Sequence, residues 1–285
     1  MRRDSDELSE VFGPLHLTPI RHARQRNQTW LLHGECGLTA VVKRYRSLSQ
    51  AAISGVIDAE NRARDAGVPV PRVLYRSPDR PLVVHAWVLG QHDVPRSFDL
   101  IDACAQQFVR HLRGLRGFLP AWTPPRPPQP PLRAREAITR SPDVQLSEDI
   151  SASWSQLGSL ASGRPTVASH ADWRADNILI LDGQVAAVLD WEYVVLLPAA
   201  EAVGYAAGSL THSWRETLYQ PLDLLPVTRF LDTAARCLNW EAGSLRAVNA
   251  RLAAFHTCAV RLAEDQHRGC ADSAITRDDL WAALG

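Results

Sequence analysis

The chain has 285 residues and a mass of 31.5 kDa, which is enough for one large domain or two lobes around a sizeable core. Its 31 basic and 31 acidic side chains cancel, and this balance excludes a general electrostatic attraction to nucleic acid or to an anionic membrane. The content of 46% hydrophobic and 22% charged residues is ordinary for a soluble globular protein.

The cysteines and the apolar runs indicate a reducing compartment. The cysteines are odd in number and scattered without a C-x-x-C pair, which argues against a disulfide framework or a zinc site; they are Cys36, Cys104, Cys237, Cys258 and Cys270. The start lacks the apolar core of an export signal, and no apolar run reaches the roughly 18 residues of a membrane span. We therefore expect a cytoplasmic protein with no membrane partner and no nucleic-acid partner.

The first part of the chain predicts a helical lead-in followed by a β-hairpin. Residues 1–20 predict a helical cap, residues 24–32 a turn and strand, and residues 38–45 the partner strand. The partner strand contains Lys43, whereas the other 30 basic residues of the chain are arginines. A lone lysine in such a chain indicates a site that needs a compact ammonium, as a crowded phosphate site does. The alternative is that this lysine remains by chance and has no functional role.

The next elements are predicted from periodicity. Residues 51–66 predict a helix that contains Glu60, and residues 80–90 predict an apolar strand that runs into a turn. Helical periodicity over residues 98–119 leads to a connector at residues 120–132 that is too rich in proline for a helix or a central strand. We expect a stiff insertion there rather than a ligand of SH3 type. Further helices are expected over residues 134–138, 150–160, 222–238, 244–263 and 274–284.

A second hairpin is predicted in the middle of the chain. Two apolar runs, residues 178–181 and 184–189, flank the pair Asp182-Gly183, which is typical of a type I′ turn. A hairpin of this length brings its two ends together. Residues that enter the first strand and leave the second should therefore be neighbours.

Those two ends carry polar residues suited to phosphate chemistry. Asn177 enters the first strand and Asp190 leaves the second, so we expect their side chains to lie side by side. Oxygen ligands at adjacent strand ends suit Mg²⁺, which usually binds a few protein oxygens together with substrate phosphates. Asp172, on the preceding loop, is placed to receive a proton from a hydroxyl group. This is the arrangement that phosphoryl transfer needs.

These residues form a recognisable motif. His170-x-Asp172-x-x-x-x-Asn177, followed by Asp190-Trp191-Glu192, resembles the catalytic and metal-binding segments of the aminoglycoside phosphotransferase/choline kinase family. The consensus sequence of the family is close to HGDLHPGN and then D-[WF]-[DE]. The chain keeps this spacing and departs from the consensus at positions that include Ala171, Arg174 and Asp176. The resemblance implies a bilobal, protein-kinase-like α+β fold, with a small β-rich N-lobe over residues 1–89 and a larger, mostly helical C-lobe over residues 90–285.

The resemblance also implies roles for individual residues. Asp172 is the expected catalytic base, and Asn177 and Asp190 are expected to hold Mg²⁺ on the phosphates of the nucleotide. Lys43, fixed by Glu60, is expected to bind the α- and β-phosphates; a solvated helix charge is the alternative for Glu60.

Three further assignments follow from the same family. In the family, a glycine-containing loop covers the phosphates of the nucleotide. In this chain residues 24–27 stand in place of those glycines, and Arg26 and Asn27 are assigned to nucleotide contact. The backbone of the hinge residues His85, Ala86 and Trp87 is expected to read the adenine edge, with packing as the main role of the His85 and Trp87 side chains. Arg174 is either a cation near the γ-phosphate or a surface charge.

The resulting hypothesis is an enzyme that transfers the γ-phosphate of ATP, or of GTP, to a hydroxyl group of a small molecule. An antibiotic is the leading acceptor, in resistance or self-protection, and a choline, amino-alcohol or sugar metabolite is the alternative. A protein Ser/Thr kinase is disfavoured because the chain passes from Glu192 to a proline and helices without an activation segment. A catalytically inactive nucleotide-binding scaffold is disfavoured because Lys43, Asp172, Asn177 and Asp190 are all present. The oligomeric state stays open.

Overall fold

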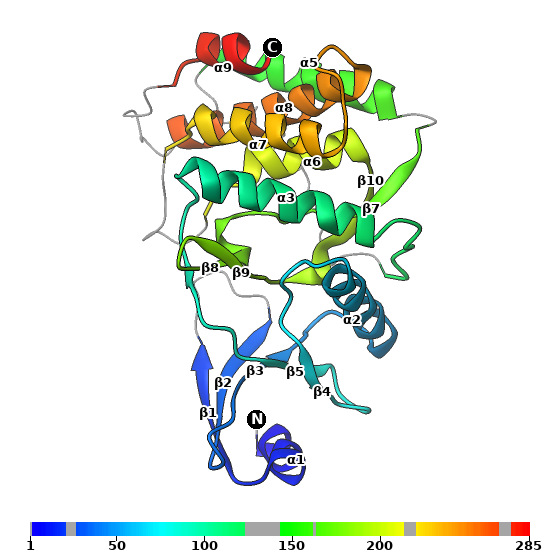
Figure 1. Ribbon diagram of the computed structural model, residues 1–285, viewed down its shortest axis with the longest axis vertical. Coiled ribbons are helices and arrows are strands. Elements are labelled where there is room, and N and C mark those ends of the chain that lie inside the picture. Colours follow the sequence, from blue (N-terminus) through cyan, green and yellow to red (C-terminus); the bar gives the residue numbers. More distant parts are fainter. Residues whose placement is uncertain (1, 21–26, 123–142, 162–163, 214–220, 268–274) are drawn as a thin grey trace.

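The computed structural model describes residues 2–20, 27–122, 143–161, 164–213, 221–267 and 275–285. A lobe that contains a five-stranded sheet and a larger helical lobe follow one another along the long axis of the molecule (Figure 1). We call them the N-lobe and the C-lobe. The arrangement confirms the expected α+β fold of two lobes.

The N-lobe is built on an antiparallel sheet with the strand order β1-β2-β3-β5-β4. Its strands are β1 (Leu15–Ile20), β2 (Gln28–Gly34), β3 (Thr39–Arg44), β4 (Val73–Arg76) and β5 (Leu82–Ala86). Two helices accompany the sheet, α1 (Arg2–Phe12) and α2 (Gln50–Asp65). The hydroxyl of Ser49 caps α2 by accepting a bond from the N–H of Ala52 at 3.2 Å, which fixes where this helix begins.

Strand alternation decides which side chains face the C-lobe. Val42 of β3 and Val84 of β5 are fully buried in one cluster with Leu8 of α1. Because neighbouring side chains of a strand point to opposite faces, Lys43 and Val83 point away from that cluster. The two residues are partners in the β3–β5 register, and Val83 belongs to the larger core that α2 shares with the C-lobe. The sheet therefore directs Lys43 toward α2 and the C-lobe.

The C-lobe is mostly helical. Its helices are α3 (Phe98–Gly114), α5 (Val144–Ala161), α6 (Ala199–Ser209), α7 (Leu224–Cys237), α8 (Leu245–His267) and α9 (Arg277–Leu284). Its short strands are β6 (Gln91–His92), β7 (Thr166–His170), β8 (Ile178–Leu181), β9 (Gln184–Val188) and β10 (Val194–Pro198). Helices α6 and α8 pack very closely, since a Cβ atom at Gly204 would lie 2.2 Å from the carbonyl oxygen of Ala250.

The predicted central hairpin is confirmed. Strands β8 and β9 pair antiparallel, and the connecting residues Asp182 and Gly183 have φ angles of 51° and 73°. Two consecutive positive φ angles are the geometry of a type I′ turn. The short strand β6 pairs with the outer side of β8.

Gly90 lies where the chain leaves the N-lobe, and its position requires glycine. Its φ angle is 151°, and a Cβ atom there would lie 3.1 Å from Cβ of Leu179. Residues from Gln91 onward then join the C-lobe sheet through β6. The division of the chain into domains at residues 89 and 90 stays a prediction.

Two elements differ from expectation. Strand β1 forms within the segment expected as a helical cap and lead-in, and β10, which was not expected, pairs with β7 before the chain enters α6. Both strands gain their hydrogen bonds from partners that are distant in sequence, which a local pattern does not reveal. Residues 123–132 of the proline-rich connector, the helix expected at 134–138 and Arg26 lie outside the described residues.

Within the described residues, Cys36, Cys104, Cys237 and Cys258 are free thiols. None of the described helices is long and apolar enough to cross a membrane.

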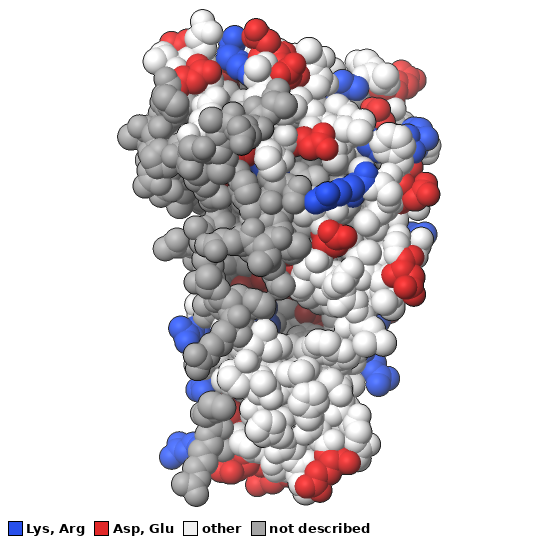
Figure 2. Space-filling view, turned by 90° about the vertical axis from the view of Figure 1, so that its left-hand side faces the viewer, with Lys and Arg blue, Asp and Glu red and all other residues white. Residues whose placement is uncertain are grey.

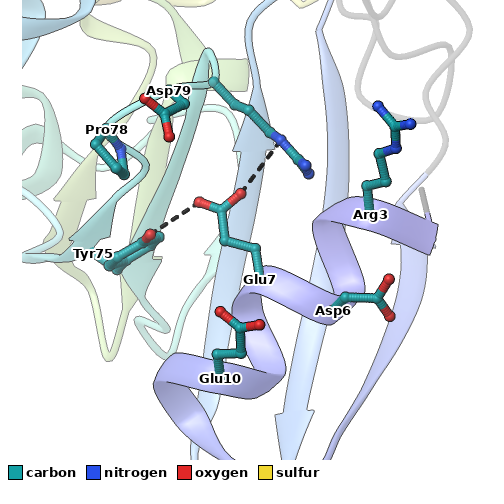
Figure 3. Close-up of a pocket in the computed structure, with 8 residues that line it drawn as sticks. Arg3, Asp6, Glu7, Glu10, Tyr75, Pro78 and Asp79 are labelled. Carbon is teal, nitrogen blue, oxygen red and sulfur yellow. Dashed lines mark hydrogen bonds and ion pairs between the residues drawn. The ribbon is translucent and has the colours of Figure 1, made fainter.

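A cavity of about 450 Å³ lies beside α1 (Figure 3). Helix α1 lies at the end of the N-lobe away from the C-lobe (Figure 1). The lining of the cavity is mostly charged. Glu7 points into it, accepts a hydrogen bond from the hydroxyl of Tyr75 at 2.9 Å and pairs with Arg80 at 3.5 Å. These bonds fasten α1 to the sheet, and the cavity is separate from the face that carries Lys43.

Candidate active site

The carboxylate of Asp172 is held in place on both of its oxygens. The side-chain amide nitrogen of Asn177 donates to the main-chain carbonyl of Asp172 at 2.8 Å and to its Oδ2 at 2.9 Å. The guanidinium Nε of Arg174 lies 3.0 Å from the other oxygen, Oδ1. The side chain of Asp172 is 19% exposed, so the oriented carboxylate remains open to a substrate.

His170 ties this loop to the end of β9. Its Nδ1 accepts a bond from the N–H of Asp172 at 3.2 Å, so the ring proton lies on Nε2, which donates to the carbonyl of Leu189 at 2.8 Å. Burial lowers the pKa of His170, which favours this neutral form. The N–H of His170 in turn donates to Nε2 of the buried His111 of α3 at 3.1 Å. The loop that carries Asp172 is thereby anchored to the helical core.

The two strand ends meet as the hairpin predicted. The N–H of Leu189 donates to the carbonyl of Asn177 at 2.8 Å, so Asn177 lies beside Leu189, the residue before Asp190. Asp190 has a left-handed backbone, with φ 66° and ψ 49°, which an aspartate adopts at a modest energetic cost.

This donor set fits Mg²⁺. Because the amide nitrogen of Asn177 already bonds to Asp172, its oxygen is the atom that can face a metal, beside the carboxylate of Asp190. The described residues contain no group of three His, Cys, Asp or Glu side chains arranged for a metal ion. Two protein oxygens completed by phosphates and water are the coordination that Mg²⁺ prefers in nucleotide sites.

Lys43 lies among acidic side chains. Its ammonium bonds to Oδ1 of Asp190 and lies 3.4 Å from Oε2 of Glu192. Burial acts to lower the pKa of Lys43, but the two carboxylates outweigh it and hold that pKa well above its usual value. Burial acts to raise the pKa of Asp190, but Lys43 outweighs it, and the pKa of Asp190 ends below its usual value. Burial raises the pKa of Glu192.

The expected pairing of Lys43 with Glu60 is wrong in this structure. The oxygens of Glu60 lie 3.2 and 3.3 Å from Nε2 of His85. The reason is strand alternation: His85 lies two residues after Val83 on the same face of β5, so it points toward α2 and meets Glu60. Lys43 instead contacts the carboxylates of Asp190 and Glu192, which follow β9.

Two further cofactor assignments change. The side chain of Asn27 is buried and points inward, since its Nδ2 donates to Oε2 of Glu192 at 2.7 Å. At the hinge, the N–H of Ala86 donates to the carbonyl of Arg72 at 2.8 Å, and the N–H of Trp87 to that of Thr39 at 3.4 Å. These two N–H groups are therefore already bonded within the N-lobe. Recognition of adenine by the hinge stays a prediction for its carbonyl groups.

Arg174 is mostly buried beside Asp172. Its side chain is 14% exposed and lies between Asp172 and Asp176, so it is not a solvated surface charge, and its role near the γ-phosphate stays a prediction. Asp176 also accepts a bond from the hydroxyl of Ser213 at 2.6 Å, and the N–H of Ala175 donates to the carbonyl of Leu210 at 3.1 Å. The segment after α6 thus braces the loop that carries Asp172.

The surface agrees with a site between the lobes. Charged side chains are spread over both lobes, and the molecule has a recessed waist between them (Figure 2). Lys43 reaches this level from the N-lobe, whereas Asp172, Asn177 and Asp190 belong to the C-lobe.

Comparison with known proteins agrees with the fold described above. The sequence profile of the phosphotransferase enzyme family matches residues 16–231. No curated protein sequence matches the chain significantly. Among solved structures, a choline kinase from Cryptosporidium parvum is similar over 93% of this chain and 88% of its own, with 13% identity and a TM-score of 0.57.

Two further phosphotransferases are similar to a comparable extent. An aminoglycoside-3'-phosphotransferase of type VIII is similar over 89% of this chain and 97% of its own, with 17% identity and a TM-score of 0.54. A macrolide 2'-phosphotransferase from Brachybacterium faecium is similar over 96% of this chain and 98% of its own, with 17% identity and a TM-score of 0.55. At such identities these likenesses show the fold. The match of the family profile over most of the chain shows that the protein belongs to the phosphotransferase enzyme family.

Proposed function

We propose that the chain transfers the γ-phosphoryl group of ATP to a hydroxyl group of an amine-bearing small molecule, with an antibiotic as the leading acceptor. The observation that carries the proposal is the carboxylate of Asp172. It is oriented by Asn177 on one oxygen and by Arg174 on the other, and the main chain of Asn177 is bonded to Leu189, the residue before Asp190. An oriented carboxylate beside a pair of metal-binding oxygens is the machinery of small-molecule kinases.

The proposed reaction assigns each group one task. The acceptor oxygen forms a bond to the γ-phosphorus while the bond from that phosphorus to the β–γ bridging oxygen breaks. The hydroxyl proton passes to Asp172, and ADP leaves. Mg²⁺, held by Asn177 and Asp190, would neutralise charge on the phosphates. Lys43 contacts the α- and β-phosphates, and Arg174 offsets the charge that spreads over the transferred group.

The charge of the site supports an acceptor that carries an amine. Among the described residues, the site holds four carboxylates, from Asp172, Asp176, Asp190 and Glu192, against the two cations Lys43 and Arg174. A bound complex of Mg²⁺ and ATP adds further negative charge. A protonated amine on the acceptor is attracted to such a site and a neutral sugar is not.

Amine-bearing antibiotics and amino alcohols both satisfy this condition. The structural neighbours named above include enzymes for an aminoglycoside, a macrolide and choline. We place the antibiotics first and an amino-alcohol metabolite such as choline second.

The test is a transfer screen with the purified protein, ATP or GTP, and Mg²⁺, read by mass spectrometry as a gain of one phosphate. The panel pairs amine-bearing antibiotics and amino alcohols with neutral sugars and deaminated analogues of the same size. We expect products from the amine-bearing members alone. Transfer only to neutral acceptors contradicts the charge argument, and no transfer to any acceptor contradicts the proposed function.

A further inference from the structure

Lys43 contacts two carboxylates that differ in exposure. Asp190 and Glu192 come from the same short segment after β9, and both lie within reach of the Lys43 ammonium. The side chain of Asp190 is 32% exposed, whereas that of Glu192 is 3% exposed. An exposed carboxylate at a strand end is accessible to other cations, and a buried one is committed to its partner within the protein.

Asp190 is not a permanent partner for Lys43. It follows the strand end beside Asn177, where the donor set fits a divalent metal, and the same carboxylate oxygen cannot bind a metal and an ammonium equally well. When the phosphates and their metal occupy the site, Lys43 needs another carboxylate to fix its position.

Glu192 is built for that purpose. Its Oε2 accepts a bond from Nδ2 of Asn27 at 2.7 Å, and its main-chain carbonyl accepts a bond from Nε1 of Trp122 at 3.1 Å. The oxygen of Asn27 is itself held by the N–H of Arg46 at 3.3 Å, next to β3. The carboxylate of Glu192 is therefore fixed from the N-lobe strand pair that carries Lys43.

Glu60 is occupied elsewhere. It is 4% exposed, and both of its oxygens face Nε2 of His85 at the start of the hinge. This contact joins α2 to β5 and leaves Glu192 as the buried carboxylate nearest to Lys43 among the contacts described.

We propose that Glu192, held by Asn27, is the residue that positions Lys43 for the phosphates, and that Glu60 instead supports the hinge strand through His85. The inference rests on the proposed function in one respect, which is that Lys43 contacts the nucleotide. Glu192 is a positioning residue: it acts through Lys43 and does not touch the reacting atoms.

The test is a double-mutant cycle on the binding of ATP with Mg²⁺, measured by calorimetry. The metal engages Asp190, so the cycle reports the state in which Lys43 depends on Glu192. Glu192→Gln is measured in the wild-type background and in Lys43→Met. The lost negative charge acts alike in both backgrounds, so the difference between them isolates the effect that passes through Lys43.

We expect Glu192→Gln to weaken ATP binding at least fivefold more in the wild-type background than in Lys43→Met. Glu60→Gln should change binding by the same factor in both backgrounds. Asn27→Ala leaves both charges in place and should show a smaller coupling in the same direction as Glu192→Gln, so it tests the inference even if Glu192→Gln fails to fold. In turnover with Mg²⁺, Glu192→Gln should lower kcat/KM for ATP at least tenfold.

Equal effects of Glu192→Gln and of Asn27→Ala in both backgrounds would overturn the inference. A larger coupling of Lys43 to Glu60 than to Glu192 would overturn it as well. Wild-type protein that binds ATP but transfers no phosphate overturns the proposed function alone, because the binding cycle still reports the partner of Lys43. Wild-type protein that binds no ATP overturns both.

Discussion

Replacing Asn177 tests the geometry of the site through stability and pH together. Its amide nitrogen makes one bond to a neutral carbonyl and one to a carboxylate of Asp172. A net contribution of about 1 kcal/mol for the first and about 1.5–3 kcal/mol for the second gives an upper range of about 2.5–4 kcal/mol. Because water and Arg174 partly replace the lost donor at the carboxylate, we expect Asn177→Ala to cost about 2 kcal/mol.

Asn177→Asp should behave differently from Asn177→Ala. It keeps an oxygen for a metal, but it removes the donor and places a second carboxylate about 3 Å from Asp172, where one of the two has a raised pKa. The folded state then binds more protons than the unfolded chain above pH 4, so its free energy of unfolding rises as the pH falls. We expect Asn177→Asp to be the less stable variant at pH 8 and to recover toward Asn177→Ala at pH 5.

Urea unfolding followed by tryptophan fluorescence measures both variants at the two pH values. Asn61→Ala is the control, since the amide of Asn61 lies on the exposed face of α2 and bonds only within that helix in the described structure. It should change stability by less than about 0.5 kcal/mol at either pH. Asn177→Asp with wild-type stability at pH 8 would refute the described contact with Asp172.

Two further predictions concern packing and acid sensitivity. Gly204→Ala should destabilise the C-lobe by about 3 kcal/mol, because its Cβ would lie 2.2 Å from the carbonyl oxygen of Ala250. The control Gly158→Ala, which has open space around it in helix α5, should be neutral or stabilising. Thermal unfolding of the two variants tests this difference. Burial lowers the pKa of His256 from 6.5 to about 4, so the unfolded chain binds more protons than the folded one between these values. The free energy of unfolding should therefore fall by about 3 kcal/mol as the pH drops from 6.5 to 4. His256→Gln can still bond to Ser153 and should remove most of this pH dependence in urea titrations. An unchanged pH dependence in His256→Gln would contradict the assignment of the effect to His256.

Local patterns were sufficient for the central hairpin. Asp182 and Gly183 are residues that accept positive φ angles, and two apolar runs of matching length surround them. The meeting of Asn177 and Asp190 follows from that geometry alone. The placement of Lys43 on β3 was also predictable from a local pattern, because its neighbours in the sequence alternate as they do in a strand.

Side-chain partners across elements were not predictable to the same degree. The helix that carries Glu60 was expected correctly, but its partner depends on which residue of β5 shares the face of Lys43, and that is set by the β3–β5 register. Glu192 stood in the recognised motif without a role, and only its contacts with Asn27 and Lys43 supply one. The bond between Asp176 and Ser213 joins residues of different elements and has no pattern in the sequence.

The central claim is that Asp172 accepts the proton of the acceptor hydroxyl. The most direct measurement compares single-turnover phosphate transfer by the wild type and by Asp172→Asn, together with the Kd for ATP and Mg²⁺. The account predicts a fall in rate of about 10²–10⁴ with a Kd within threefold of the wild type, because the amide keeps the size of the side chain and cannot take the proton. An Asp172→Asn variant that retains more than a tenth of the wild-type rate would contradict the claim.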